Sequence, residues 1–308
     1  MERLDGGATV PGPLRGGVVA LGNFDGFHAG HQAVVARAVT RARERGRPAI
    51  VATFDPHPRR YFQPQLPPFR LTSLDQRARL FAAAGADAML VFAFDAALAG
   101  LSAEGFAERL ADGIGASGVV TGTDFTFGKA RSGDVGVLRT LGERHGFTAE
   151  TVAPVESGAT VVSSSRIRDL LREGRPREAA GLMTRPFAVE GVVEHGAKLG
   201  RQLGYPTANL RMGKYLRPAY GIYAVTGRLA DGRVLKGAAN LGIRPTIAGE
   251  PVELLEPYFF DFEGDLYGQV IEVALIDYLR AEAKFESLDA LKVQMAADCD
   301  RARAALDG

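Results

Sequence analysis

The chain of 308 residues contains a single cysteine, Cys299, which excludes an intrachain disulfide framework and a zinc site built on several cysteines. The formal net charge is only +1 and no acidic tail is present, so charge gives no sign of a nucleic-acid partner. No apolar run is long enough to cross a membrane, and residues 1–17 lack the apolar segment of a signal peptide. We therefore expect a cytoplasmic protein that binds neither nucleic acid nor a membrane.

The composition is that of an ordinary globular protein, with 46% apolar and 24% charged residues. The length suits two domains of roughly 100–200 residues each. Residues 1–15 show no clear pattern, and we expect them to be loosely ordered.

Two different patterns divide the rest of the chain. Up to about residue 183, short apolar strands alternate with amphipathic helices, which predicts a doubly wound parallel α/β sheet. From Phe187 onward, paired strands joined by turns such as Asp231-Gly232 predict an antiparallel β-barrel with a closing helix over residues 287–306. We therefore expect domains at residues 1–185 and 186–308.

The stretch over residues 18–31 predicts a strand, a tight turn and the start of a helix. Residues 18–21 are an apolar run typical of a buried parallel strand, and His28 and His31 follow at the start of a helix predicted over residues 32–45. Anions bind at such helix starts in open α/β sheets, and imidazoles there can stabilise a transferring phosphoryl group. The alternatives are a capping and a packed histidine, or a zinc pair that lacks further ligands.

A second helix start, at residues 163–168, combines three serines with Arg166 and Arg168. Hydroxyls, free backbone N–H groups and a guanidinium one turn later can hold a triphosphate. An N-capped surface helix is the alternative. Together, the two helix starts predict nucleotidyl transfer, in which an incoming phosphate attacks the α-phosphorus of a triphosphate accompanied by Mg²⁺.

Residues 196–210 contain the densest motif of the second half. Glycines there allow the backbone to approach phosphate, and Lys198 and Arg201 supply positive charge. In an extended segment, Thr207 and Asn209 share one face and offer two neutral oxygens to Mg²⁺ or phosphate. A barrel loop with surface charges is the alternative.

Glu256 lies on an alternating face that is otherwise apolar, over residues 252–262. A carboxylate in such a place is costly unless it is paired or functional. It could accept a proton from a substrate hydroxyl during phosphoryl transfer. The alternatives are an edge-strand position or a buried ion pair with an arginine such as Arg244.

Taken in order, these motifs resemble the prokaryotic bifunctional FAD synthetases, whose first half belongs to the HxGH nucleotidyltransferase superfamily. The resemblance extends from about residue 17 to residue 303. The segments that carry it are residues 22–31, 53–58, 122–128 and 163–168 in the first half, and residues 204–209, 240–246, 254–262 and 265–268 in the second. Three positions depart from the usual family pattern. Phe27 stands where a smaller aliphatic residue is usual and Thr126 where arginine is frequent, and Pro257-Tyr258 replaces a pair that often ends in histidine.

The resemblance implies a role for particular residues. In the first half, it assigns His28 and His31 to catalysis on ATP phosphates. It further assigns Gly22, Asn23, Phe24, Ser164 and Arg168 to ATP, and Asp55, Asp124 and Phe125 to the flavin. For Asp124 and the aromatic residues near it, the adenine side is the alternative. In the second half, it makes Glu256 the catalytic base on the ribityl 5′-hydroxyl. There it also assigns Thr207 and Asn209 to Mg²⁺ and ATP, Gly196 and Lys198 to ATP phosphates, and Arg244 to the flavin.

The implied activity has two steps, carried out by a monomer or a transient oligomer. The barrel phosphorylates riboflavin with ATP to give FMN, and the α/β domain adenylates FMN with ATP to give FAD and pyrophosphate. One alternative is a single-activity protein with one degenerate half. Another is a flavin- or nucleotide-binding regulator, against which the presence of His28, His31 and Glu256 argues. A nucleic-acid role, as in other HxGH proteins, lacks an electrostatic footprint.

Overall fold

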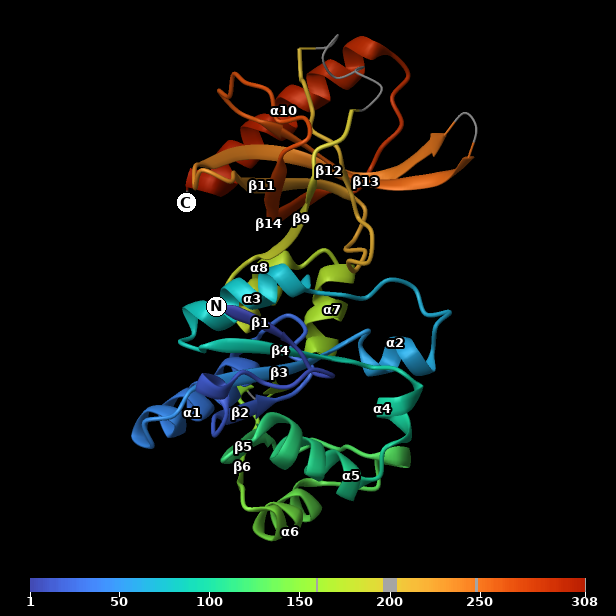
Figure 1. Cartoon of the computed structure of the whole chain (residues 1–308). Coiled ribbons are helices and arrows are strands. Elements are labelled where there is room, and N and C mark those ends of the chain that lie inside the picture. The colour runs from blue at the N-terminus through green and yellow to red at the C-terminus, as the bar shows by residue number, and fades with distance from the viewer. Residues whose placement is uncertain (159, 196–203, 247–248, 308) are drawn as a thin grey trace. The chain divides into compact units, whose positions relative to one another are not determined.

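The structure is a computed structural model that describes all residues except 159, 196–203, 247–248 and 308. Contacts divide the chain into two compact units (Figure 1). The first comprises Met1–Leu66 and Leu74–Ser163, and the second comprises Pro67–Ser73 and Ser164–Gly308.

The first unit is built on a six-stranded sheet in which every pair of neighbouring strands is parallel. The strands lie in the order β1-β4-β3-β2-β5-β6, so the direction of winding reverses between β2 and β5. Ligands bind at such a reversal in open α/β sheets. The strands are β1 (Glu2–Asp5), β2 (Val18–Leu21), β3 (Ala49–Asp55), β4 (Ala88–Ala93), β5 (Gly118–Gly122) and β6 (Thr148–Val152).

Helices cover both faces of this sheet because strand residues alternate between two buried clusters. On one face, Val18 and Ala20 pack with α1 (Ala29–Glu44) and α3 (Leu74–Ala83). On the other face, Val19 and Leu21 pack with four further helical segments. These are α4 (Ala96–Gly100), α5 (Ala103–Glu108), a π-helical turn (Arg109–Ile114) and α6 (Val135–His145). The predicted doubly wound sheet is confirmed.

Residues 1–15 are not loosely ordered, and that prediction was wrong. β1 adds to the sheet edge in parallel with β4, with Glu2 opposite Ala88. The strand has no clear apolar pattern because an edge position buries only Leu4 among its four residues. The smaller elements of this unit are a 3₁₀ turn at Gly12–Leu14, α2 (Pro58–Phe62), a 3₁₀ turn at Lys129–Arg131, β7 (Glu156–Ser157) and β8 (Thr160–Val161).

The second unit contains a six-stranded antiparallel sheet in the order β10-β13-β12-β11-β14-β9. The edge strands are linked by a hydrogen bond of 2.9 Å from the amide of Glu194 to the carbonyl of Asn209, so the barrel is nearly closed. Tyr223, Leu255 and Leu275 are fully buried in it. The strands are β9 (Phe187–Val192), β10 (Leu210–Arg211), β11 (Gly221–Arg228), β12 (Val234–Thr246), β13 (Gly249–Phe259) and β14 (Val270–Arg280).

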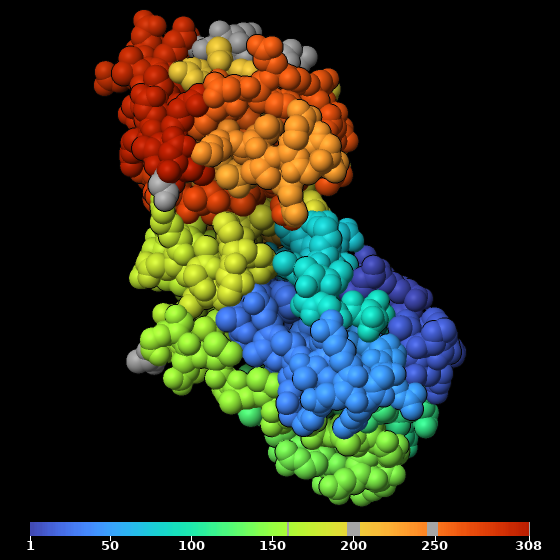
Figure 2. All heavy atoms as spheres, turned by 90° about the vertical axis from the view of Figure 1, so that its left-hand side faces the viewer, coloured from blue at the N-terminus to red at the C-terminus, as the bar shows by residue number. Residues whose placement is uncertain are grey.

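A long C-terminal helix, α10 (Leu288–Asp307), packs against β11, β12 and β14 (Figure 2). Ala302 of this helix is buried against Ala224, Ala238 and Phe260 of the barrel. The outer face of these strands is therefore covered as well as the interior. The predicted antiparallel barrel with a closing helix is confirmed.

The second unit also contains α7 (Ser164–Arg172) and α8 (Pro176–Met183). The segment at residues 67–73 belongs to the same unit. Its Arg70 forms an isolated β-bridge with Tyr215. The boundary after residue 185 stays a prediction, and it falls between the end of α8 and the start of β9.

Candidate active sites

The first candidate site is the loop between β2 and α1, at the point where the order of the parallel strands reverses. His28 caps α1, and its Nδ1 accepts a hydrogen bond of 3.4 Å from the backbone amide of His31. This role as an acceptor puts the proton of a neutral His28 ring on Nε2. The two imidazoles stack with 3.6 Å between their centroids, so both predicted histidines stand together at the first turn of the helix.

The loop before these histidines is held from two neighbouring elements. The hydroxyl of Thr53, on β3, donates to the carbonyl of Asn23 at 2.8 Å. Arg77, on α3, donates to the same carbonyl at 3.2 Å and to the Asp25 carboxylate at 3.3 Å. Both Arg77 and Asp25 are only 2% exposed. The sequence motif contains Asp25, but nothing in the sequence links it to Arg77, which is 52 residues away.

Two predicted ATP residues in this loop, Gly22 and Phe24, lie against each other. A Cβ at Gly22 would come within 3.1 Å of the Phe24 ring, so a larger residue there would require this buried ring to shift by a few tenths of an ångström. Phe24 has a positive φ of 49°, a conformation that non-glycine residues rarely adopt. Phe27, which departs from the family pattern, also has a positive φ, and its ring packs 5.0 Å from that of Phe81. The larger side chain therefore fills the core.

The residues predicted to hold the flavin lie at the same edge of the sheet. Asp55 ends β3, whereas Asp124 and Phe125 follow β5, and these two strands flank β2. The carboxyl ends of parallel strands meet at one edge, so the three residues lie on the side of the sheet where the histidine loop lies. Phe125 stacks on Phe127 with 5.8 Å between ring centroids, and Asp124 is exposed.

An aromatic cluster at this edge was missed by sequence reasoning. Tyr61 and Phe62 of α2 pack with Phe94, which follows β4, with ring centroids 5.1–5.8 Å apart. Phe62 is nevertheless 66% exposed. The dipeptide of Tyr61 and Phe62, next to the Asp55 motif, was the only signal, and its contact with Phe94 could not be read from spacing.

Ser164 and Arg168 belong to the second unit. Ser164 is the first residue of α7. Arg168 is 7% exposed, and its Nε donates to the carbonyl of Phe69 at 2.8 Å. The guanidinium is thus anchored by the segment at residues 67–73. A triphosphate shared between this helix start and that of α1 stays a prediction.

The second candidate site is a cavity of about 380 Å³ between the barrel and α10. It brings together three predicted residues: Thr207, Arg244 and Glu256. Asn209 is buried two residues beyond Thr207, and its Oδ1 has no hydrogen-bond partner among the described residues. Gly196 and Lys198 lie outside the described residues.

Glu256 is 4% exposed, and it faces Arg244. Nε of Arg244 lies 2.8 Å from Oε2, and Nη2 lies 2.6 Å from Oε1. Burial raises the pKa of Glu256, and the Arg244 charge and hydrogen bond oppose that rise. The ion pair considered as an alternative from the sequence is therefore present.

The walls of the cavity divide into a polar and an apolar part. The polar part includes Asn240, whose Nδ2 donates to Glu282 at 3.3 Å. Arg280 and Asp298 form an ion pair of 2.6 Å between β14 and α10. Burial raises the pKa of Cys299 to about 11, so this thiol stays protonated at neutral pH. The apolar lining includes Ile222, Ala238, Tyr258, Phe285, Leu291 and Met295.

Family models match both halves of the chain. A model described as FAD synthetase matches residues 11–166, and one described as riboflavin kinase matches residues 183–306. A protein of Pseudomonas fluorescens described as bifunctional riboflavin kinase/FMN adenylyltransferase is 43% identical over 291 residues, 94% of this chain and 93% of the relative. The chain belongs to this bifunctional family. A protein of Haemophilus influenzae with the same description is 38% identical, covering 94% of each chain.

A solved structure extends the similarity to the whole fold. It comes from Streptococcus pneumoniae, is described as a macrolide-efflux protein, and matches with a TM-score of 0.87 at 30% identity, over 98% of this chain and 99% of that chain. In the described part of the present chain, no helix is long and apolar enough to span a membrane. The family membership expected from the sequence motifs is confirmed.

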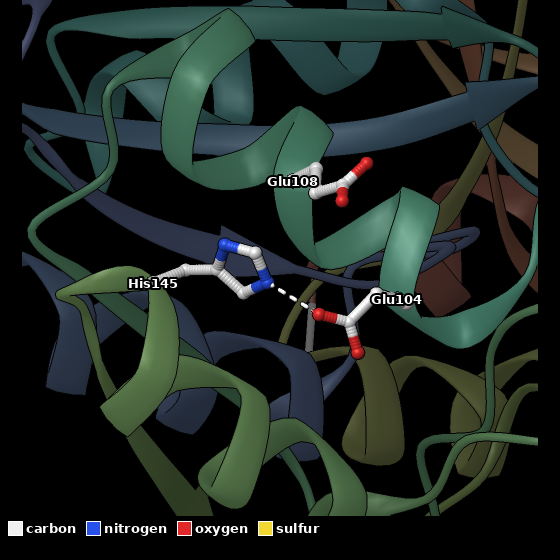
Figure 3. Close-up of side chains that lie close together, drawn as sticks. All are labelled: Glu104, Glu108 and His145. Atoms are coloured by element: carbon white, nitrogen blue, oxygen red, sulfur yellow. Dashed lines mark hydrogen bonds and ion pairs between the residues drawn. The ribbon is translucent and has the colours of Figure 1, made fainter.

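A third group of polar side chains lies between α5 and the end of α6 (Figure 3). Potential ligand atoms of Glu104, Glu108 and His145 all lie within 4.8 Å of one another. Glu104 accepts hydrogen bonds from Arg144 at 3.0 Å and shares one of 2.8 Å with Nε2 of His145. These bonds lower the pKa of Glu104. These hydrogen bonds link α5 to the end of α6. They explain why the side chains lie close together, and a metal ion is not needed to explain it.

Proposed function

We propose that the chain makes FAD from riboflavin in two ATP-dependent steps, as the names of its relatives describe. The barrel cavity converts riboflavin to FMN, and the α/β unit converts FMN to FAD with release of pyrophosphate. The observation that carries the proposal is the pair of sites within one chain of this family. One is a stacked pair of histidines at a helix start, and the other is a buried carboxylate in a largely apolar cavity.

In the kinase step, the apolar walls of the cavity suit a flavin ring, and the polar end suits the ribityl chain. Glu256 takes the proton of the 5′-hydroxyl as this oxygen forms a bond to the γ-phosphorus of ATP. The bond between the γ-phosphorus and the β,γ-bridging oxygen breaks, and ADP leaves. In the sequence-based assignment, Arg244 contacts the flavin, and Gly196 and Lys198 approach the phosphates of ATP.

Mg²⁺ fits the chemistry of Thr207 and Asn209. Asn209 offers a buried amide oxygen that accepts no hydrogen bond from the described residues, and neutral oxygens are ligands for this hard cation. These two residues would hold the ion. When bound, it neutralises charge on the phosphates of ATP.

In the adenylation step, a phosphate oxygen of FMN attacks the α-phosphorus of ATP, and the bond to pyrophosphate breaks. His28 and His31, with backbone N–H groups at the start of α1, stabilise the developing negative charge. ATP lies against Gly22, Asn23 and Phe24, and Ser164 and Arg168 bind its phosphates. The flavin is held by Asp55, Asp124 and Phe125, and the exposed Phe62 offers a further ring for stacking.

We place the enzyme in the cytoplasm, as a monomer or a transient oligomer that needs no nucleic acid. The test of the function is incubation of the purified chain with riboflavin, ATP and Mg²⁺, followed by chromatographic separation of the flavins. FMN should appear first and FAD second, and chelation of Mg²⁺ should stop both. The absence of both products from a folded protein would contradict the proposal.

A further inference from the structure

Arg244 reaches the Glu256 carboxylate from a distant position on the neighbouring strand. In the register of β12 and β13, Glu256 lies opposite Asn240, whereas Arg244 lies opposite Val252. The guanidinium therefore extends back along β12 to form its two contacts of 2.8 and 2.6 Å. Such a contact between non-opposed residues requires a clear path along one face of the strand.

Gly242 lies between the two residues on this face. Asn240, Gly242 and Arg244 share one face of β12 because side chains alternate along a strand. A Cβ at Gly242 would lie 2.2 Å from Oε1 of Glu282, so the Glu282 carboxylate fills the space that a side chain would take. The glycine therefore makes room for Glu282 beside the ion pair of Arg244 and Glu256.

The guanidinium of Arg244 contacts both oxygens of Glu256. Nε donates to Oε2 at 2.8 Å, and Nη2 lies 2.6 Å from Oε1. The carboxylate is therefore fixed in one orientation. Each of its oxygens has a second lone pair, which a hydroxyl proton can use.

We propose that Arg244 is a positioning residue of the kinase site, which holds the Glu256 carboxylate by both oxygens in the orientation that accepts the proton of the substrate hydroxyl. The proposal rests on the proposed function, in which Glu256 is the base. Arg244 acts through Glu256, and its side chain is 40% exposed at the end of the pair where solvent reaches it. This role differs from the flavin contact expected from the sequence.

Charge around Glu256 makes the role testable. Burial and the Glu282 carboxylate both raise the pKa of Glu256, whereas the charge and hydrogen bond of Arg244 and a hydrogen bond from Asn240 lower it. Arg280 is bound to Asp298 in its own ion pair. Loss of Arg244 therefore leaves Glu256 with a higher pKa. The titratable and charged groups that line the cavity with Glu256 are Tyr205, Arg244, Tyr258, Arg280, Glu282, Asp298 and Cys299.

The experiment measures FMN formation as a function of pH for the wild type, Arg244→Gln and Arg244→Lys. The acid limb of kcat/KM reports the pKa of the free base. An arginine beside a carboxylate lowers its pKa by about 1–3 units, and partial exposure of Arg244 points to the lower end of that range. We expect the acid limb of Arg244→Gln to move up by about one pH unit. The loss of kcat/KM relative to the wild type should therefore become smaller as the pH rises. Arg244→Lys keeps the charge and should keep the limb near its wild-type position, with a lower kcat.

Arg217→Gln is the matched control. Nε of Arg217 donates to Glu253 at 2.6 Å, and Glu253 lies on β13, the strand that carries Glu256. Neither Arg217 nor Glu253 lines the cavity. The acid limb of Arg217→Gln should stay in place. FAD formation from supplied FMN, which uses the other unit, should be unchanged in Arg244→Gln and serves as the check on folding. If Arg244→Gln does not fold, the Arg244→Lys limb decides, and a shift as large as the one expected for Arg244→Gln would overturn the proposal.

Two other outcomes would overturn it in distinguishable ways. A raised KM for riboflavin in Arg244→Gln with an unmoved acid limb would make Arg244 a flavin contact and leave the proposed function intact. Full kinase activity in Glu256→Gln would remove the base itself, and with it both the proposed kinase mechanism and the role of Arg244.

Discussion

Replacement of Glu256 by glutamine separates catalysis from stability. Glutamine has the size and shape of a protonated glutamate, so Glu256→Gln opens no cavity at a side chain that is 4% exposed. It removes the proton acceptor of the kinase step. General bases contribute about 10²–10⁴-fold to rate, so we expect FMN formation to fall by about that factor. FAD formation from supplied FMN should be unaffected.

Although Glu256→Gln should lower the rate of FMN formation, it should not lower the stability of the fold. Burial raises the pKa of Glu256 above its value in the unfolded chain, so the fold favours the protonated side chain. That contribution to stability is complete below the unfolded pKa and is lost as the pH rises through the folded pKa. Above the folded pKa, ionised glutamate has lost this contribution to the free energy of unfolding, whereas glutamine, which does not ionise, keeps it. The difference is about 1.4 kcal/mol for each pH unit that separates the folded from the unfolded pKa. Glu256→Gln should therefore unfold at the same temperature as the wild type or higher at neutral pH.

Glu253→Gln is the control on the same strand, and its expected result is the reverse. The hydrogen bond from Arg217 lowers the pKa of Glu253, so this carboxylate stabilises the fold above its unfolded pKa and loses that effect as the pH falls through its folded pKa. The variant should unfold at a lower temperature at neutral pH but keep its kinase activity. Thermal unfolding and flavin chromatography test both variants. A Glu256→Gln enzyme with kcat within about tenfold of wild type would refute the role of Glu256 as a base.

Three further predictions concern the other assigned residues. His31→Ala should reduce FAD formation from FMN by about 10²–10³-fold with FMN formation unchanged, as measured by separate assays of the two steps. Asn209→Leu should raise the Mg²⁺ concentration needed for half-maximal kinase activity, and an unchanged requirement would exclude Asn209 as a ligand. Phe62→Ala should raise the KM for FMN by about 2–10-fold, the value of an aromatic contact, without a change in unfolding temperature, because the ring is 66% exposed.

Local signals in the sequence were reliable where the local chain decides the conformation. Serine is a typical helix N-cap, and the hydroxyl of Ser102, directly before α5, accepts from the amide of Gly105 at 3.0 Å. The Asp231-Gly232 turn was expected to join two strands, and it lies between β11 and β12 with a φ of 89° at Gly232. Each depends on residues a few positions apart, whose contacts follow directly from spacing.

The face of β13 that carries Glu256 illustrates where such reasoning stops. Alternation predicts one buried and one exposed face, but both faces of this strand are buried. Leu255 and Phe259 point into the barrel, and Glu256 and Phe260 lie on the face that α10 covers. A helix that begins 32 residues later creates the cavity, because it covers an outer face that an uncovered barrel would expose to solvent.

The sequence by itself determined the two kinds of fold, the histidine pair at a helix start, and Glu256 as an unusual carboxylate. Periodicity and turn chemistry express these features within short segments. Only the tertiary structure decided that β1 completes the sheet edge, that α7 and α8 join the second unit, and that Arg77 reaches the histidine loop. It also decided which of the partners considered for Glu256 is real, because Arg244 meets it through strand register, and register is a property of the assembled sheet.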